Sequence, residues 1–414
     1  MIKCKFRISI SIMGFCLLFL LVLTSCEKQL PEAGLKAGIW RGEIIAQGNK
    51  IPFNFEVEKE EGAYRINLIN GDEKLKIEGV DILGDSLFFN MHIFDSSIKA
   101  EIFQDSLSGT YTKNYAENYV LPFKAVYGKK GRFDHVSSSD KFDGTWETTF
   151  KTKEGKETPA IGIFKAQDSV LKGTFLTKTG DYRFLDGYTV KDTMYLFTFD
   201  GNHIYRFRAF KETDSVLNGE YWSGKTSYKT FISQRNDTAR LPDAKSLTYL
   251  KEGYDKIEFS FPDLEGKLTS LDEERYKDKI IILQILGTWC PNCMDETIFL
   301  SEWYKRNASK GVEIIGLAYE NKPDFEYAKN RVQTMKEKLK VPYDFLIAGT
   351  SSTEAASESL PMLNKVISFP TTIIIDKEGT VRRIHTGFSG PATGIYYEEF
   401  VDDFNQFMKG LMEE

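Results

Sequence analysis

The sequence of 414 residues predicts an all-β region followed by an α/β domain. Two observations indicate this organisation. Landmarks between Gly38 and about Arg235 recur once, at a spacing of about 107 residues, and such recurrence is the signature of an internal repeat. After about Gly253, short strand-like runs give way to longer apolar runs that alternate with helical patterns. We therefore divide the chain into residues 1–25, 26–135, 140–238, a linker at 239–252, and 253–414.

The first 25 residues have the pattern of an export signal. Three basic residues precede an uncharged, mostly apolar run over residues 8–23, which is short for a bilayer span of about 20 residues and suits the core of a signal peptide. The run ends in Leu23-Thr24-Ser25-Cys26, which resembles the bacterial lipobox. That resemblance implies cleavage before Cys26 and lipidation of Cys26. An uncleaved signal anchor is the alternative.

Both alternatives predict that the rest of the chain lies in the cell envelope, outside the cytoplasm and held to a membrane. A lipid-anchored protein could face the periplasm or belong to the outer membrane, and the sequence leaves these two places open. The formal charge of the chain is -6, without the basic excess that marks a nucleic-acid-binding protein. We therefore expect a membrane contact through lipid and no nucleic-acid partner.

The cysteines indicate chemistry rather than a stapled fold. Of the five cysteines, Cys4 and Cys16 would leave with the signal, and Cys26 would carry lipid. Only Cys290 and Cys293 then remain as thiols. An exported protein that relied on disulfides for stability would distribute cysteines across its loops. A single close pair therefore predicts a reactive dithiol.

The repeat predicts two related β-rich units. Its matched landmarks keep the same order in both copies: Gly38-Ile39-Trp40 with Gly144-Thr145-Trp146, Pro52 with Pro159, residues 85–89 with 192–196, and Gly109-Thr110-Tyr111 with Gly219-Glu220-Tyr221. Within the copies, apolar and polar residues alternate in short runs that turn residues separate. This pattern is typical of antiparallel sheet closed into a barrel or a sandwich.

The function of the repeats is less determined by sequence. His92, His135 and His203 lack metal-ligand spacing, so we interpret them as structural residues. The many aromatic residues are most simply core and cross-strand pairs. A ligand site at a barrel mouth is the alternative.

The last 160 residues or so predict an α/β sandwich. The expected elements, in order, are a hairpin around 259–266, a buried strand at 280–286, a helix from 290 or 291 to about 306, a strand at 312–318, an amphipathic helix at 325–339, a helix at 353–363, strands at 371–375 and 381–385, and a helix at about 396–412. The cysteine pair lies where the buried strand meets the first long helix.

That position explains why these cysteines can exchange disulfides. Residues at i and i+3 lie on one helical turn, close enough for disulfide geometry. The unpaired N–H groups and the dipole at the helix N-terminus favour a thiolate at Cys290. Pro291 suits the first helical position because its missing N–H would be unpaired there.

Trp289-Cys290-Pro291-Asn292-Cys293, with Phe369-Pro370-Thr371-Thr372 downstream, resembles the thioredoxin superfamily. Extracytoplasmic TlpA/ResA-like thiol-disulfide oxidoreductases are the most similar branch, and the resemblance covers 253–414. It implies a thioredoxin-like fold in which Cys290 attacks a partner disulfide and Cys293 resolves the mixed disulfide. It also implies a cis peptide before Pro370, and substrate contacts from Trp289, Pro291 and Phe369.

The same resemblance implies the partners. We expect the domain to reduce disulfides of extracytoplasmic proteins, to receive electrons from a membrane donor, and to use no cofactor other than the Cys290–Cys293 disulfide. Thioredoxins often bury an acid a few residues before the first cysteine, where this chain has Gln284. By analogy with ResA-like proteins, we expect Glu320 to accept the proton of Cys293. A solvated surface glutamate is the alternative for Glu320.

Rival functions lack residues that they need. Structural zinc requires about four ligands, and no second cysteine pair or histidine cluster accompanies Cys290 and Cys293. Covalent haem requires histidine where Met294 stands. A peroxiredoxin would have threonine in place of Gly287. A non-enzymatic alternative remains, in which an envelope lipoprotein binds a ligand or partner through its β region and uses the dithiol as a redox sensor.

Overall fold

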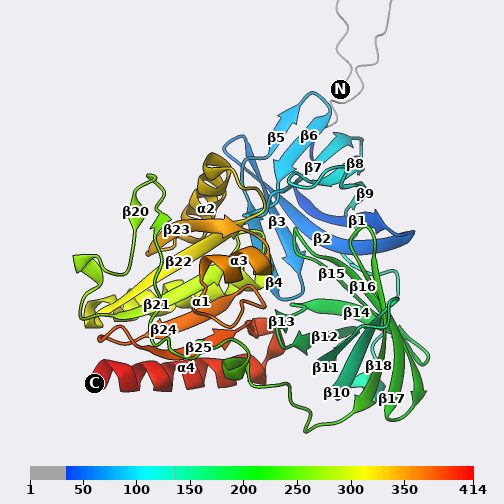
Figure 1. The fold of residues 1–414 in the computed structure, drawn as a ribbon. Coiled ribbons are helices and arrows are strands. Elements are labelled where there is room, and N and C mark those ends of the chain that lie inside the picture. Colours follow the sequence, from blue (N-terminus) through cyan, green and yellow to red (C-terminus); the bar gives the residue numbers. More distant parts are fainter. Residues whose placement is uncertain (1–33, 136) are drawn as a thin grey trace, which may run out of the picture.

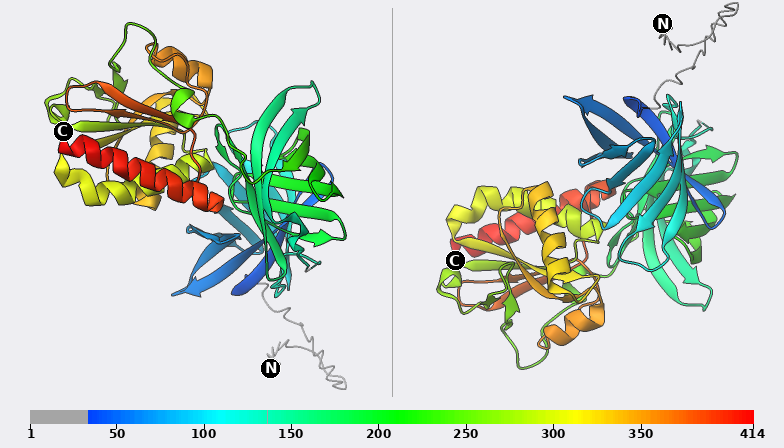
Figure 2. Two further views of the ribbon diagram at one scale, coloured as in Figure 1. Left: turned by 90° about the horizontal axis from the view of Figure 1, so that it is seen from below. Right: turned by 90° about the horizontal axis from the view of Figure 1, so that it is seen from above.

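The computed structural model describes residues 34–135 and 137–414, and they form two β-sheets and a C-terminal α/β domain (Figure 1). The expected signal segment and Cys26 lie outside the described residues. Among the described residues, none of the helices is long and apolar enough to cross a membrane. In both views of Figure 2 the α/β domain lies to one side of the two sheets.

The first repeat forms an antiparallel nine-stranded sheet in the order β4-β3-β2-β1-β9-β8-β7-β6-β5. Its strands are β1 (Gly38–Ala46), β2 (Asn49–Glu60), β3 (Ala63–Asn70), β4 (Glu73–Ile77), β5 (Asp81–Leu83), β6 (Ser86–Asn90), β7 (Ser96–Ile102), β8 (Ser106–Lys113) and β9 (Val120–Tyr127). Alternate residues point inward, as in β2, where Phe53, Phe55 and Val57 are buried. The sheet is a half-barrel, since β4 and β5 are its two edges.

The second repeat forms another nine-stranded antiparallel sheet, and this one closes on itself. Its strands are β10 (Gly144–Thr152), β11 (Glu157–Gln167), β12 (Val170–Thr177), β13 (Gly180–Asp181), β14 (Leu185–Val190), β15 (Thr193–Phe199), β16 (Ile204–Thr213), β17 (Val216–Ser223) and β18 (Ser227–Arg235). Closure comes from the pairing of β12 with β14 through Leu171–Gly173 and Leu185–Gly187. The predicted barrel is thus a full barrel in the second copy and a half-barrel in the first.

The length of one strand accounts for this difference. In the second copy, β13 pairs with only the last two residues of β12, so the rest of that edge can bond β14. In the first copy, β4 pairs with the last five residues of β3 and occupies the corresponding edge. Backbone N–H and C=O groups need partners. Because the longer β4 already pairs with this edge of β3, β5 cannot pair with β3 and close the sheet.

The repeat landmarks occupy equivalent places in both sheets. Trp40 and Trp146 are both fully buried, and each indole N–H donates to the carbonyl four residues earlier, at 2.9 Å. Pro52 pairs with Glu43 in β1, and Pro159 pairs with Thr149 in β10. A buried indole needs a hydrogen-bond partner for its N–H, and both repeats supply the equivalent backbone carbonyl for it.

The C-terminal domain has a mixed five-stranded sheet in the order β23-β22-β21-β24-β25. The strands β21, β22 and β23 are parallel, and β24 and β25 run antiparallel to their neighbours. A two-stranded hairpin, β19 (Phe261–Pro262) and β20 (Leu268–Thr269), precedes it. The sheet strands are β21 (Ile280–Leu286), β22 (Val312–Glu320), β23 (Asp344–Thr350), β24 (Thr371–Ile375) and β25 (Val381–Thr386), and the helices are α1 (Pro291–Asn307), α2 (Phe325–Leu339), α3 (Thr353–Ser359) and α4 (Ile395–Glu413).

Most elements of this domain agree with the sequence prediction, and two do not. No strand was predicted at β23, whose apolar centre is short. The helix predicted over residues 353–363 is shorter, since α3 ends at Ser359. Pro361 explains the early end, because the residue before a proline is disfavoured in helical conformation. The core of this domain is aromatic where α1 meets α4: the ring centroid of Phe299 lies 5.4 Å from that of Phe400 and 5.2 Å from that of Phe404.

Candidate active site

The cysteine pair lies at the carboxyl end of the central strand β21, where the chain turns into α1. All seven residues of β21 are buried, so the strand fixes the turn rigidly. Cys290 caps the helix, and its Sγ accepts the N–H of Cys293 at 3.2 Å. This bond holds the Cys290 sulfur at the helix N-terminus.

The two thiols differ in access to solvent. Both are free cysteines; Cys290 is 7% exposed and Cys293 is fully buried. Burial, together with the hydrogen bond and charge of the neighbouring Cys290 sulfur, raises the pKa of the Cys293 thiol well above its ordinary value. Cys293 therefore keeps its proton until another group takes it, whereas Cys290 can meet a substrate first.

The loop before β24 faces Cys290. The peptide bond between Phe369 and Pro370 is cis, and the Cys290 thiol donates to the Phe369 carbonyl at 3.5 Å. Trp289 packs edge-on against Phe369 with ring centroids 5.6 Å apart, and its indole N–H donates to the carbonyl of Tyr319 at 2.9 Å. The structure therefore brings Trp289 and Cys290 together with the Phe369–Pro370 loop. Cys290 and Phe369 are hydrogen-bonded although they lie 79 residues apart in the sequence.

Glu320 ends β22 and is fully buried, so the alternative of a solvated surface glutamate is wrong. Its two carboxylate oxygens accept the backbone N–H and the hydroxyl of Thr288, each at 2.8 Å. Burial raises the pKa of Glu320 to about 7. The carboxyl therefore holds the loop that leads into the cysteine motif.

A second buried carboxyl, Glu296, was not predicted from the sequence. It accepts the Gln284 amide at 2.9 Å and the Thr372 hydroxyl at 2.8 Å. Burial raises its pKa to about 7, and its charge contributes to the raised pKa of the Cys293 thiol. Its spacing was an available signal, because residue i+3 from Cys293 lies on the same buried face of α1.

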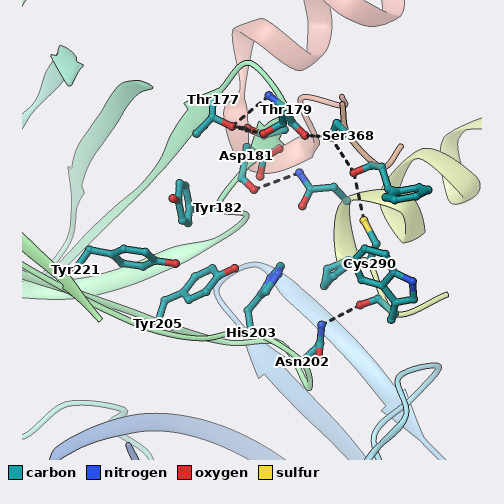
Figure 3. Close-up of a pocket in the computed structure, with 15 residues that line it drawn as sticks. Thr177, Thr179, Asp181, Tyr182, Asn202, His203, Tyr205, Tyr221, Cys290 and Ser368 are labelled. Carbon is teal, nitrogen blue, oxygen red and sulfur yellow. Dashed lines mark hydrogen bonds between the residues drawn. The ribbon is translucent and has the colours of Figure 1, made fainter. Parts of the chain in front are cut away.

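A cavity of about 310 Å³ opens in front of Cys290. The sequence-predicted contact residues Trp289, Pro291 and Phe369 line it. The opposite wall comes from the second barrel (Figure 3). The barrel supplies Thr177, Thr179, Gly180, Asp181, Tyr182, Asn202, His203, Tyr205 and Tyr221. Among the histidines expected to be structural, His203 thus lies at the site.

The barrel is bonded directly to the cysteine motif. Asn202, in the loop between β15 and β16, donates to the carbonyl of Trp289 at 2.8 Å. Asn292, between the two cysteines, donates to the carbonyl of Asp181 at 3.2 Å. Ser368 donates its hydroxyl to the carbonyl of Thr179 at 2.8 Å. These bonds fix the barrel against the cysteine motif and against Ser368, which precedes the cis-proline loop.

A buried cluster of ion pairs also joins the second barrel to α1. Arg183, fully buried, donates to Asp295 of α1 at 2.9 and 2.8 Å, to Asp200 at 3.1 Å and to Glu73 of the half-barrel at 2.5 Å. One guanidinium thus links all three parts of the protein. Burial raises the pKa of Glu73 to about 7 and that of Asp295 to about 6.

In the described part of the chain, no three histidine, cysteine, aspartate or glutamate side chains are grouped as metal ligands would be. The thiols and carboxyls around Cys290 support thiol chemistry on their own. An accessible thiol at a helix N-terminus can exchange with a disulfide, and a buried neighbour can complete the exchange.

Comparisons with known proteins agree with this geometry. The Redoxin family model matches residues 238–396. ResA, a thiol-disulfide oxidoreductase of Geobacillus thermodenitrificans, is 27% identical over 40% of this chain and 79% of its own. ResA of a Bacillus cereus strain is 35% identical over 31% of this chain and 66% of its own.

A solved structure of a thiol:disulfide interchange protein from Chlorobium tepidum covers 39% of this chain and 98% of its own, with 22% identity and a TM-score of 0.30. The two ResA relatives and the Redoxin match place the similarity in the C-terminal region, where the cysteine motif lies. The C-terminal region of this chain is a TlpA/ResA-like thiol-disulfide oxidoreductase domain of the thioredoxin superfamily.

Proposed function

We propose that the protein reduces disulfides of extracytoplasmic partner proteins while tethered to a membrane through Cys26. The observation that carries the redox part is the asymmetry of the dithiol: Cys290 borders the cavity, whereas Cys293 is fully buried behind it. A dithiol with one accessible and one shielded thiol can attack a partner and then release it.

The reaction follows from these positions. The Cys290 thiolate attacks one sulfur of the partner disulfide, so the partner S–S bond breaks, a mixed disulfide forms and one partner thiolate leaves. Cys293 then loses its proton and attacks the Cys290 sulfur, which releases the second partner thiolate and forms the Cys290–Cys293 disulfide. Two electrons pass from the dithiol to the partner. A membrane electron donor would return two electrons.

The cis-proline loop supports the first step. Pro370 has no N–H to direct at the sulfurs, and the Phe369 backbone beside it faces Cys290. In the proposed reaction, the backbone of Phe369 aligns an extended partner segment. Trp289 and Pro291 border the same cavity and would contact that segment.

The direction of electron flow is testable by redox titration of the dithiol in the full chain. A reductant of the thioredoxin type has a potential of about -270 mV, and a strong oxidant about -120 mV. We expect a value near the former, measured by equilibration with glutathione or dithiothreitol buffers and thiol alkylation. A value near -120 mV would contradict the proposed reduction of partners.

The tether is testable by metabolic labelling with a fatty acid. Cys26→Ser should abolish incorporation of labelled palmitate, because the thiol that would carry an acyl chain is lost. Ser25→Ala is a matched control that keeps the thiol. Absence of label from the unmodified protein, or equal labelling of the Cys26→Ser protein, would contradict lipid tethering.

Proton transfer from Cys293 is the step for which two carboxyls compete. Both Glu296 and Glu320 have pKa values raised to about 7 by burial, but the charge of Glu296 acts on the Cys293 thiol. We propose Glu296 as the proton acceptor, in addition to the sequence-based candidate Glu320. An acceptor must be ionised, so the resolving step should accelerate as pH rises through about 7.

Glu296→Gln should remove this inflection and slow the resolving step by roughly 100-fold, a typical general-base contribution. The variant is uncharged, like the protonated carboxyl. Its amide oxygen can still accept from Gln284, and its NH2 group can donate to the Thr372 hydroxyl. Stopped-flow fluorescence of mixed-disulfide decay between pH 6 and 8.5 measures the step. Glu320→Gln is the matched comparison, and loss of the inflection only in Glu320→Gln would assign the role to Glu320.

The same substitution has an effect on stability. The folded pKa of about 7 lies above the ordinary value of 4.5, so the folded protein keeps a proton that the unfolded chain releases between these values. Stability from this group is therefore lost as pH rises from about 4.5 to about 7. Glu296→Gln should flatten that loss in urea unfolding curves.

A further inference from the structure

The cavity wall opposite Cys290 is a cluster of tyrosines at the mouth of the second barrel. Tyr182, Tyr205 and Tyr221 pack edge-to-face, with ring centroids 5.3 to 5.4 Å apart. Figure 3 shows them across the cavity from Cys290, with His203 between. Edge-to-face packing in a barrel core makes this wall rigid.

A turn of the same barrel narrows the approach to the thiol. The turn between β12 and β13, residues 177–180, bonds Ser368 through the Thr179 carbonyl at 2.8 Å. It also touches the backbone at Gly387, where an added Cβ would lie 2.8 Å from the Thr179 carbonyl carbon. A broad partner surface could reach the Phe369 loop on this side only by displacing the turn.

The described residues that line the cavity include no lysine, arginine or glutamate. The one aspartate, Asp181, has both carboxylate oxygens occupied, by the N–H of Arg183 at 2.5 Å and that of Gly390 at 2.6 Å. His203 is oriented by Asp200, with Nδ1 and Oδ2 3.0 Å apart. An acidic substituent would therefore lose water without meeting a lysine or arginine in the lining.

The cavity size agrees with a slender ligand. Its 310 Å³ lies at the lower end of small-molecule sites, which span about 300–1,000 Å³. That volume holds a few uncharged groups around a disulfide.

We propose that the second barrel is the substrate-recognition half of this active site. It admits disulfides carried on slender, uncharged groups, as in an unfolded segment of a protein or a small organic disulfide, and it excludes disulfides on folded surfaces. This inference rests on the proposed reduction of disulfides. The dithiol exchange is the one given above, with two electrons passing from Cys290 and Cys293 to the admitted disulfide.

The test is single-turnover reduction by the pre-reduced full chain, followed by tryptophan fluorescence. The substrates are 2-hydroxyethyl disulfide, a pair of disulfide-linked unstructured peptides with glycine and tyrosine flanks, the same peptides with aspartate flanks, and a folded protein with one surface disulfide. We expect the neutral peptides to react at least tenfold faster than either the acidic peptides or the folded protein. Fast reaction of the small disulfide alone would assign the site to small molecules, and fast reaction of the neutral peptides to unfolded segments.

Substitutions in the turn between β12 and β13 test whether this turn selects between the substrates. Thr179→Trp fills the mouth and should slow the neutral peptides at least tenfold, with a smaller effect on 2-hydroxyethyl disulfide. Thr179→Gly should speed the folded substrate. Lys178→Trp is the matched control, since Lys178 is exposed and outside the cavity lining, and it should behave as the unmodified protein.

Reduction of the folded protein as fast as the faster of 2-hydroxyethyl disulfide and the neutral peptides would overturn the inference, as would Thr179 variants that match Lys178→Trp. These outcomes leave the proposed function standing, because disulfides are still reduced. Failure to reduce any of the four substrates, with the dithiol shown to be reduced by alkylation, would overturn the proposed function and the inference with it.

Discussion

Cys290→Ser should lower disulfide reduction by on the order of 10³-fold or more, the scale on which loss of a catalytic nucleophile acts. Cys293 cannot replace Cys290, because Cys293 is fully buried and its thiol pKa is raised well above the ordinary value. The serine hydroxyl can still accept the N–H of Cys293, so α1 keeps its cap. The effect should therefore appear in activity and not in thermal unfolding.

Cys293→Ser should have a different outcome. The attack by Cys290 remains, but nothing expels the partner, so the covalent complex accumulates. Non-reducing electrophoresis after acid quench should show a mixed disulfide with Cys293→Ser and none with Cys290→Ser. Equal trapping by both variants, or unchanged insulin reduction by Cys290→Ser, would contradict the assigned roles.

Arg183→Met should destabilise the protein by about 3–5 kcal/mol, the cost of removing one partner from a buried ion cluster. The three carboxylates of Glu73, Asp200 and Asp295 would then face one another without a cation. Urea unfolding at pH 7.5, followed by tryptophan fluorescence and by reactivity of Cys290, measures the loss. Separation of the barrel from α1 should make Cys290 reactive before global unfolding.

Lowering the pH should partly restore the stability of the Arg183→Met variant. The pKa values of Glu73 and Asp295 are already raised to about 7 and about 6 by burial, so near pH 5 both groups are largely neutral. Lys172→Met is the matched control, because Lys172 bonds Asp72 across the same two sheets at 2.6 Å on the surface. Exposed pairs contribute about 0–1 kcal/mol. Equal destabilisation by both variants would contradict a special role for the buried cluster.

Local signals made much of this protein predictable. The period-3.6 pattern from Phe325 to Leu339 and the mostly apolar run from Ile280 to Leu286 predicted the bounds of α2 and β21. Both patterns follow directly from which residues the helix and the strand bury. The repeat identified equivalent strands, as the two buried tryptophans show. The Phe369-Pro370 motif pointed to the loop that faces Cys290.

Features that depend on contacts between distant segments were not predictable in the same way. The spacing of Glu296 from Cys293 indicates only the face of α1 on which it lies, and its enclosure depends on Gln284 and Thr372 from two other strands. His203 and Tyr205 carry no motif, and only the docking of the barrel brings them to Cys290. Closure of one β repeat and not the other depends on how many residues β13 and β4 pair with their neighbours.

The loop between β15 and β16 has a consequence for how the protein is made. The Gly201 carbonyl accepts the hydroxyls of Ser96 at 2.6 Å and Tyr111 at 3.1 Å from the half-barrel, while Asn202 holds the Trp289 carbonyl. A ribosome completes both β repeats before residue 289 emerges. The barrel platform that narrows the approach to Cys290 can therefore fold before the α/β domain docks on it.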